Sequence, residues 1–195
     1  RDGRDLIVRW MHDLGLVIQI DGIGNVIGTR TGILDSPPVI IGSHIDSVAT
    51  GGLYDGALGV LAGLEAIQTL NDADLKTQYP IAVGFFTNEE GVRFTPDMMG
   101  SAVHQGSLSL ETALETVGTD GQTVGAELSR IGYAGDIPVN NMIPRAYLEL
   151  HIEQGPVLEN TNTTIGAVTG VQGISWTEFE LQGVSNHAGT TPMHL

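Results

Sequence analysis

The sequence predicts an α/β domain built on a central mixed sheet flanked by helices, and two observations support this class. Short apolar runs typical of buried strands recur along the chain, and segments with helical spacing separate them. The 195 residues are 41% hydrophobic and only 16% charged, which is enough apolar material for a core and too little charge for a disordered chain. We therefore expect one medium domain, followed by the start of a second.

The first third of the chain alternates helical and extended patterns. Apolar side chains at helical spacing predict a helix over 5–14, with Gly15 as its stop. The segment 16–20 and a second one bracketed by glycines, over 22–28, predict a hairpin. The apolar run 37–42 predicts a buried strand.

The same alternation continues toward the middle of the chain. A 3.6-residue period predicts a helix over 55–70, and the apolar run 81–86 predicts another buried strand. Residues 111–142 carry a weak helical pattern broken by turn signals. The run 146–150 predicts a third core strand. Strands alternating with helices are typical of α/β domains.

The pattern changes near Thr164, where two strands are predicted over 165–171 and 176–181. We place a domain boundary at about residue 172, so that 1–171 forms an incomplete α/β domain and 172–195 begins another. The chain starts without Met and stops directly after a dense polar motif. We therefore expect a fragment of a longer protein.

The charge balance and the absence of cysteine exclude several classes of function. Eight basic against 23 acidic residues give a net charge of −15, which disfavours nucleic acid and anionic membrane surfaces as partners. Without cysteine there are no disulfides, thiol nucleophiles or cysteine zinc sites. No apolar run approaches the roughly 20 residues of a membrane span, and no signal segment is readable. We expect a cytoplasmic protein.

Three polar clusters follow the three apolar strands directly. They occupy 43–46, 87–91 and 151–155, and together hold two histidines and several carboxylates. Ligands of open α/β sheets gather outside the carboxyl ends of the strands, so these side chains are expected to converge. Nitrogen and oxygen donors without sulfur suit Zn, Mn, Co or Ni. The clusters therefore predict a metal site.

Each candidate also has an ordinary structural interpretation. His44 and Asp46 point to the same side of an extended chain, so Asp46 could orient the imidazole for a metal or simply cap a strand end. Asp55 could be a ligand or a first-turn acid that favours a helix N-terminus. Glu89 and Glu90 face different directions, so one could bind metal while the other carries protons, or both could be solvated.

Other catalytic motifs do not fit this sequence. His151 and Glu153 match the H-x-E of zinc deaminases, but that chemistry needs a later C-x-x-C and the chain has no cysteine. The patterns H-E-x-x-H and G-x-S-x-G are absent. The glycines over 22–28 do not complete a dinucleotide-binding fingerprint.

Five motifs, taken together and in this order, resemble the amidase, hydantoinase/carbamoylase family. They are GSHIDSV (42–48), GGLYDG (51–56), NEEGVRF (88–94), ELHIEQGP (149–156) and NHAGTTPM (186–193). The family includes N-carbamoyl-L-amino-acid hydrolases, allantoate amidohydrolases and β-ureidopropionases, and belongs to the aminoacylase and carboxypeptidase superfamily of two-metal hydrolases. The resemblance implies a zinc-exopeptidase-like catalytic domain with an inserted lid and dimerisation domain, and a homodimer of the full-length protein.

The resemblance also implies roles at the matching positions. The expected ligands of two divalent ions, Zn or else Mn, Co or Ni, are His44, Asp55, Glu90 and His151. Asp55 would bridge the ions, Glu89 would be the general base, and Asp46 would orient His44. Gln154 would contact the substrate amide, and His187 would stabilise the reacting oxygen.

The implied reaction is cleavage of the ureido C–N bond of an N-carbamoyl-L-amino acid by metal-activated water. Allantoate and β-ureidopropionate are the alternative substrates. Because the family places a further ligand and further substrate contacts beyond Leu195, we expect the 195-residue polypeptide to be inactive by itself. A metal-binding fragment without activity is the alternative from another class of function.

Overall fold

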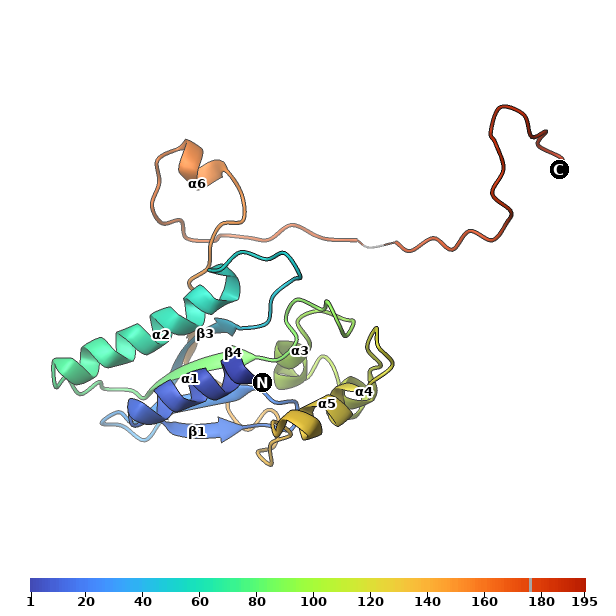
Figure 1. Cartoon of the computed structure of the whole chain (residues 1–195). Coiled ribbons are helices and arrows are strands. Elements are labelled where there is room, and N and C mark those ends of the chain that lie inside the picture. Colours follow the sequence, from blue (N-terminus) through green and yellow to red (C-terminus); the bar gives the residue numbers. More distant parts are fainter. Residues whose placement is uncertain (176) are drawn as a thin grey trace. The chain divides into compact units, whose positions relative to one another are not determined.

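The computed structural model describes residues 1–175 and 177–195, which form two units, 1–154 and 155–195. The first unit contains a five-stranded sheet (Figure 1). In sequence order its strands are β1 (Val17–Ile20), β2 (Val26–Arg30), β3 (Val39–His44), β4 (Ile81–Phe86) and β5 (Ala146–Leu148). Their order across the sheet is β1-β2-β4-β3-β5.

The sheet is mixed, as predicted. β1 and β2 form the predicted antiparallel hairpin, and β2 is also antiparallel to β4. β3 runs parallel to both β4 and β5. His44 pairs with Phe86 at the last position of the β3–β4 ladder, so the segments that follow these strands leave the sheet at the same edge. Parallel pairing thus brings two of the predicted polar clusters together.

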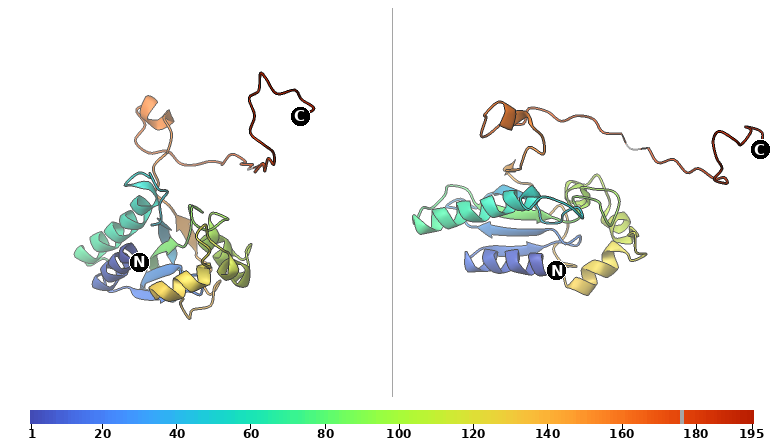
Figure 2. Two further views of the ribbon diagram at one scale, coloured as in Figure 1. Left: turned by 45° about the vertical axis from the view of Figure 1, so that its right-hand side comes forward. Right: turned by 45° about the horizontal axis from the view of Figure 1, so that its top comes forward.

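Helices accompany this sheet in the first unit. They are α1 (Asp2–Asp13), α2 (Asp55–Asp72), α3 (Met99–Gln105), α4 (Leu110–Glu115) and α5 (Val124–Ile131). α1 packs on β1 and β2, and α2 packs on β3 and β4. The two helices lie side by side on one face of the sheet (Figure 2). The α/β class predicted from the alternating patterns is confirmed.

The main core lies between this face and the two helices. Val83 and Phe85 of β4 are fully buried there with Met11 of α1 and Val60 and Ile67 of α2. The opposite face carries a smaller cluster made of Ile27, Ile40 and Ala82, against which Met142 packs. The alternation of side chains along a strand sends odd and even positions of β4 to different faces.

α2 approaches the sheet closely because glycines line its inner face. A Cβ atom on Gly59 would lie 2.7 Å from the Leu150 carbonyl oxygen and 2.8 Å from the Cβ atom of Ser43. A Cβ atom on Gly56 would overlap the imidazole of His44. The absence of side chains at these two positions lets the start of α2, with Asp55, lie against the carboxyl end of β3.

A buried amide ties the hairpin turn to the far end of β4. Asn25 is 1% exposed, and its Nδ2 donates to Oδ2 of Asp21 and to the carbonyl of Gly100, both at 2.9 Å. Its Oδ1 accepts from the backbone N–H of Thr87 at 2.9 Å. One side chain thereby fixes three segments: the turn before β2, the residue after β4 and the first turn of α3.

A buried arginine reinforces the same junction. The guanidinium of Arg4 lies over the rings of Phe85 and Tyr133, 5.3 and 5.0 Å from their centroids. It donates to the carbonyl of Gly24 at 2.6 Å and to Oγ1 of Thr87 at 3.0 Å. These contacts connect α1 to the segment that carries the Glu89–Glu90 pair.

Among its described residues, the second unit contains one short helix, α6 (Val157–Asn160). The strands predicted over 165–171 and 176–181 are wrong for the described residues of these ranges, which form no strand and expose their apolar side chains, as at Val171 and Leu181. An alternating segment becomes a strand only where a neighbouring strand pairs with it and buries one face. Trp176, which begins the second range, lies outside the described residues. The boundary at residue 172 stays a prediction.

None of the described helices combines the length and the apolar character that a membrane crossing requires.

Replacing Asn25 by alanine should lower the free energy of unfolding by about 2–4 kcal/mol, because it leaves the buried Thr87 N–H and Gly100 carbonyl without their partners, at roughly 1–3 kcal/mol each. Urea denaturation followed by circular dichroism measures this. The control is Asn141→Ala at an exposed asparagine, which should stay within about 0.5 kcal/mol of wild type. Equal stability of the two variants would contradict the assigned role of Asn25.

Gly59→Ala should destabilise the fold by about 1–3 kcal/mol, because the new methyl group meets backbone and Cβ atoms that cannot move aside independently. Gly3→Ala, in a helix position with open space around it, is the matched control and should be neutral or stabilising by up to about 1 kcal/mol. Thermal unfolding of both variants tests the close packing of α2. A Gly59→Ala protein as stable as wild type would show that α2 can shift without cost.

Candidate metal centre

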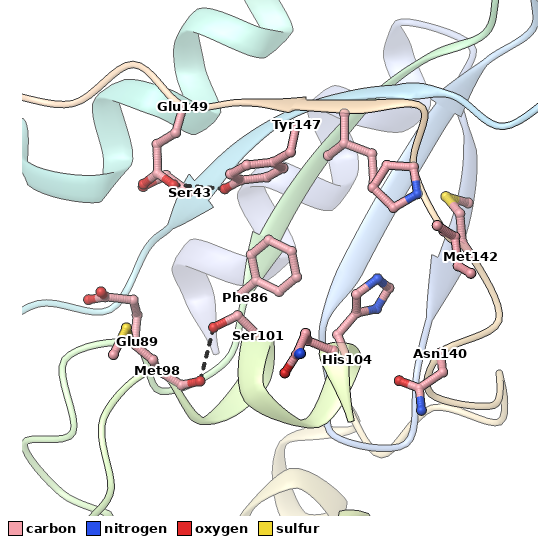
Figure 3. Close-up of a pocket in the computed structure, with 14 residues that line it drawn as sticks. Ser43, Phe86, Glu89, Met98, Ser101, His104, Asn140, Met142, Tyr147 and Glu149 are labelled. Atoms are coloured by element: carbon pink, nitrogen blue, oxygen red, sulfur yellow. Dashed lines mark hydrogen bonds between the residues drawn. The ribbon is translucent and has the colours of Figure 1, made fainter. Parts of the chain in front are cut away.

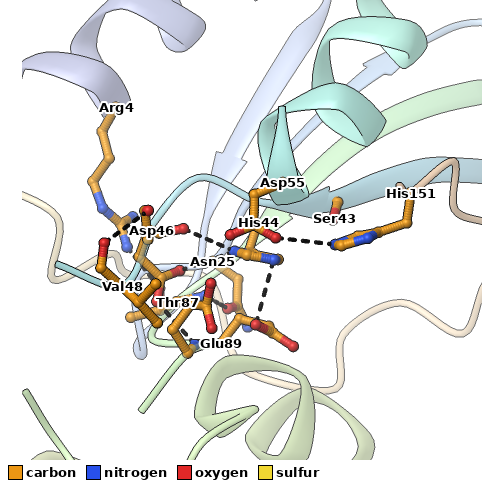
Figure 4. Close-up of polar contacts among 12 residues, drawn as sticks. Arg4, Asn25, Ser43, His44, Asp46, Val48, Asp55, Thr87, Glu89 and His151 are labelled. Atoms are coloured by element: carbon orange, nitrogen blue, oxygen red, sulfur yellow. Dashed lines mark hydrogen bonds and ion pairs between the residues drawn. The ribbon is translucent and has the colours of Figure 1, made fainter. Parts of the chain in front are cut away.

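The three predicted clusters converge at the carboxyl edge of the sheet, around His44 (Figure 4). His44 is the last residue of β3, Glu89 and Glu90 follow β4, and His151 follows β5. Asp55 reaches the same place from the first residue of α2. The carboxyl end of parallel strands is where open α/β sheets bind ligands.

The first group of possible metal ligands consists of His44, Asp55 and His151. One donor atom from each lies within 4.8 Å of the other two. Nε2 of His151 is 3.5 Å from Oδ1 of Asp55, and the two imidazoles stack with centroids 5.9 Å apart. His44 and Asp55 are 3% and 6% exposed, so the donors are held in a largely buried position.

The second group consists of His44, Glu89 and Glu90, again with donor atoms within 4.8 Å of one another. Nε2 of His44 is 3.3 Å from Oε2 of Glu89. The four predicted ligands are therefore divided between two groups that share His44, and Glu89 joins the second. Their assignment as ligands or as proton carrier stays a prediction.

Backbone carbonyls fix the orientation of both imidazoles. Nδ1 of His44 lies 2.9 Å from the carbonyl of Asp46, and Nδ1 of His151 lies 2.9 Å from the carbonyl of Ile152. Because a carbonyl only accepts, each contact is a hydrogen bond donated by Nδ1, and it turns Nε2 toward the centre, where a metal ion could bind it. Both Nε2 atoms face carboxylates, so the two rings are oriented as metal ligands usually are.

The carboxylate of Asp46 lies near His44, as expected, and also has a second partner. Its Oδ1 is 3.7 Å from Nδ1 of His44, whereas its Oδ2 accepts a hydrogen bond from the backbone N–H of Glu90 at 3.1 Å. Asp46 therefore contacts His44 most closely through its backbone and Glu90 through its side chain. It connects the segments that follow β3 and β4.

The segment that carries Glu89 and Glu90 folds back onto α3. The N–H groups of Met98, Met99 and Gly100 donate to the carbonyls of Glu89, Asn88 and Thr87, respectively. Asn88 adopts a left-handed conformation with φ of 53°, and its amide donates to the carbonyl of Phe94 at 2.7 Å. Asparagine tolerates this conformation better than most residues. The turn is thereby held closed with both glutamates at the site.

Crowded carboxyl groups make the centre electrostatically suited to cations. Burial raises the pKa of Glu89; His44 opposes this rise, and the charges of Asp46 and Glu149 add to it. Burial, a hydrogen bond with Asp55 and the negative charges nearby raise the pKa of Glu90 to about 7. Two carboxyl groups that close together retain a proton near neutral pH, and a divalent cation can take the place of that proton.

The donor set therefore fits divalent metal ions. It offers imidazole nitrogens and carboxylate oxygens without sulfur, already oriented and close together. The side-chain amide of Gln154, the predicted substrate contact, also contacts these donors: its Nε2 donates to Oδ1 of Asp55 at 3.1 Å.

His187 lies in the second unit, where it is exposed and its Nδ1 accepts from the backbone N–H of Gly189 at 3.1 Å. Its predicted role toward a reacting oxygen stays a prediction.

A pocket of about 790 Å³ opens beside Glu89, on the face of the sheet opposite α2 (Figure 3). Phe86, Met98 and Tyr147 give it an apolar lining, and Glu149 lines it next to Ser43. Glu89 and Glu149 thus place carboxyl groups at the end of the pocket that borders the candidate ligands.

Two kinds of group that support the centre, backbone carbonyls and a distant arginine, could not be identified from sequence motifs. The carbonyls of Asp46 and Ile152 leave no signal in the side-chain sequence, since every residue has a carbonyl. Arg4 lies 83 residues from Thr87 and looks like an ordinary helix surface residue. The composition offers one clue: only eight residues of the chain are Lys or Arg, so a basic residue such as Arg4 is unusual here.

Comparison with known proteins identifies relatives that cover nearly all of the chain. The chain is 48% identical over 195 residues to the N-carbamoyl-L-amino-acid amidohydrolase of Rhizobium meliloti, covering all of this chain and 47% of that protein. It is 35% identical over 202 residues to allantoate deiminase 1 of Glycine max, covering 98% of this chain and 41% of that protein. The chain thus spans about half the length of the curated relatives it matches, or less.

A solved structure from Burkholderia multivorans, described as an amidase of the hydantoinase/carbamoylase family, superimposes with a TM-score of 0.81 and 51% identity. The superposition covers 83% of this chain and 39% of that one. The resemblance that the five motifs indicated is confirmed. Residues 40–193, which are most of the chain and include all of the predicted site residues, match the model of peptidase family M20/M25/M40, and the chain therefore belongs to that family.

Proposed function

We propose that the protein containing this chain is a two-metal amidohydrolase that cleaves the ureido C–N bond of N-carbamoyl-L-amino acids. The observation that carries the proposal is the convergence of two imidazole Nε2 atoms on Asp55, with Glu89 next to His44. The name of the Rhizobium meliloti relative supports the choice of substrate. The products would be the free amino acid, ammonia and carbon dioxide.

His44, Asp55 and His151 would hold one divalent ion, and Asp55 and Glu90 would contribute to a second. Zn, or else Mn, Co or Ni, suits these donors. Such ions, when bound, polarise a carbonyl group and lower the pKa of water toward neutrality. The orientation of both imidazoles would reduce the reorganisation that binding requires.

Glu89 would move the protons of the reaction. Its carboxylate would accept a proton from the attacking water and pass it to the leaving nitrogen, so that no net proton is lost at the enzyme. Burial raises the pKa of this group, which brings it closer to the pH at which such transfers are efficient. The turn that contains Glu89 is hydrogen-bonded to the start of α3, and this would hold the Glu89 carboxylate in place.

Gln154 and His187 would recognise the substrate. In the structure the Gln154 amide already lies at Asp55, so a small rotation of its side chain would let it reach a ureido group beside the ions. His187 would neutralise charge that develops on the tetrahedral oxygen, a role that comes from the family resemblance. We propose, on that resemblance alone, a homodimer with a cytoplasmic location.

Allantoate is the second candidate substrate, favoured by the similarity to allantoate deiminase 1. The decisive experiment is an ammonia-release assay of the full-length protein with Zn, Mn, Co or Ni. N-carbamoyl-L-amino acids, N-carbamoyl-β-alanine and allantoate are compared as substrates by kcat/KM. Preference for allantoate or for N-carbamoyl-β-alanine would reassign the substrate, and no turnover of any of them would refute the function.

Replacing Glu89 by glutamine in the full-length protein should lower kcat by about 10²–10⁴-fold, because the amide cannot accept the proton of water. The metal content, measured by elemental analysis, should stay near that of wild type. Glu111→Gln, at an exposed helix position, is the control and should keep full activity. Loss of metal together with activity would place Glu89 among the ligands instead.

Asp46→Ala should weaken metal binding or activity by about 10–100-fold, because the N–H of Glu90 loses the carboxylate that holds it. Asp46→Asn keeps an acceptor for that N–H and should lose less. Zinc titration against a competing chelator and kcat/KM measure both effects. Wild-type values in the alanine variant would mean that the Asp46 backbone carbonyl alone suffices to organise the site.

A further inference from the structure

We propose that Ser43 and Glu149 form a positioning pair that sets the spacing of His44 and His151 and thereby the affinity for divalent cations. The proposal rests on the metal centre of the proposed function and assigns a task to two residues that this function leaves unused. Neither residue is a member of the two groups of possible ligands. Both lie next to those ligands in sequence, Ser43 directly before His44 and Glu149 two residues before His151.

The pair is joined by a short hydrogen bond across the sheet. Oγ of Ser43 donates to Oε1 of Glu149 at 2.5 Å, between residues that are 106 positions apart. Ser43 is only 3% exposed, so its hydroxyl depends on this partner rather than on bulk water. Hydrogen bonds from a hydroxyl to a carboxylate are short and about twice as strong as those between neutral groups.

The second oxygen of Glu149 is also fixed. Oε2 accepts from the hydroxyl of Tyr147 at 2.8 Å, and Tyr147 itself pairs with Ile40 in the β3–β5 ladder. The carboxylate therefore lies between a hydroxyl of β3 and a hydroxyl of β5 (Figure 3). Both oxygens are therefore engaged, and the contact with the buried Ser43 is the one that links the two strands.

The location of the pair explains why it matters for the histidines. The backbone pairing of β3 with β5 ends at Ile41 and Leu148, short of His44 and His151. Beyond that point, backbone register no longer determines how far apart the two segments lie. The Ser43–Glu149 hydrogen bond continues the connection by side chains, immediately before the two stacked imidazoles. Loss of this hydrogen bond would let the two segments move apart and would change the distance between the two Nε2 atoms.

The experiment uses the full-length protein and four variants. Ser43→Ala and Glu149→Ala remove the pair, Glu149→Gln keeps an oxygen acceptor for Ser43, and Tyr147→Phe removes only the neighbouring bond to Oε2. For each protein, zinc affinity is measured by chelator competition, the thermal midpoint is measured without metal, and kcat and KM are measured separately. The glutamine and phenylalanine variants are the matched controls.

We expect Ser43→Ala and Glu149→Ala to weaken zinc binding about tenfold or more, in the range that loss of residues supporting a ligand commonly causes. Their KM values should change less than their kcat values, since neither residue is assigned to the substrate. Glu149→Gln and Tyr147→Phe should stay within about threefold of wild-type zinc affinity, because both keep the Ser43 hydrogen bond.

Two results would overturn the proposal. Wild-type zinc affinity in both alanine variants, even with a lowered thermal midpoint, would make the pair a purely structural contact. A loss in Glu149→Gln equal to that in Glu149→Ala would assign the effect to negative charge instead of positioning. If wild type binds zinc but hydrolyses no ureido substrate, the proposed function fails, whereas the zinc measurements still decide on the pair.

Discussion

The position of the edge that carries the candidate metal centre depends on the amide of Asn25. It is buried at the junction of the hairpin turn, the end of β4 and the first turn of α3, and it has a partner in each. Thr87, which it holds, is followed at once by Asn88, Glu89 and Glu90. The placement of both glutamates therefore traces back to a residue 62 positions before Thr87. Arg4 contacts the same threonine from α1 and closes the junction from the helical side.

The candidate centre is organised from outside by groups that take no part in binding. Backbone carbonyls select the protonated nitrogen of each histidine, and the Asp46 carboxylate holds the backbone at Glu90. A set of donors oriented in this way loses little conformational freedom when a ligand arrives, which favours tight binding. Burial, with the hydrogen bond to Asp55 and the nearby negative charges, raises the pKa of Glu90 to about 7 at this centre.

Local patterns predicted most of the sheet but little of the contact network around the site. The strand over 81–86 and the helix beginning at Asp55 follow from apolar period, which is a property of neighbouring residues. The convergence of His44 and His151 followed from strand ends and motifs. By contrast, the Ser43–Glu149 contact joins distant residues with no shared motif spacing. The described residues of the strands predicted over 165–171 and 176–181 lack a partner strand, which local alternation cannot supply.

The glycines of α2 have a consequence for the order in which the molecule assembles. Gly56, Gly59 and Gly63 each cost an isolated helix about 1 kcal/mol relative to alanine, so this segment has weak helicity until β3 and β4 are there to receive it. Asp55 is its first residue and reaches His44 only when the helix docks. Docking of α2 and completion of the candidate centre are therefore one folding event. A cation bound there would stabilise the docked position of the helix on the sheet.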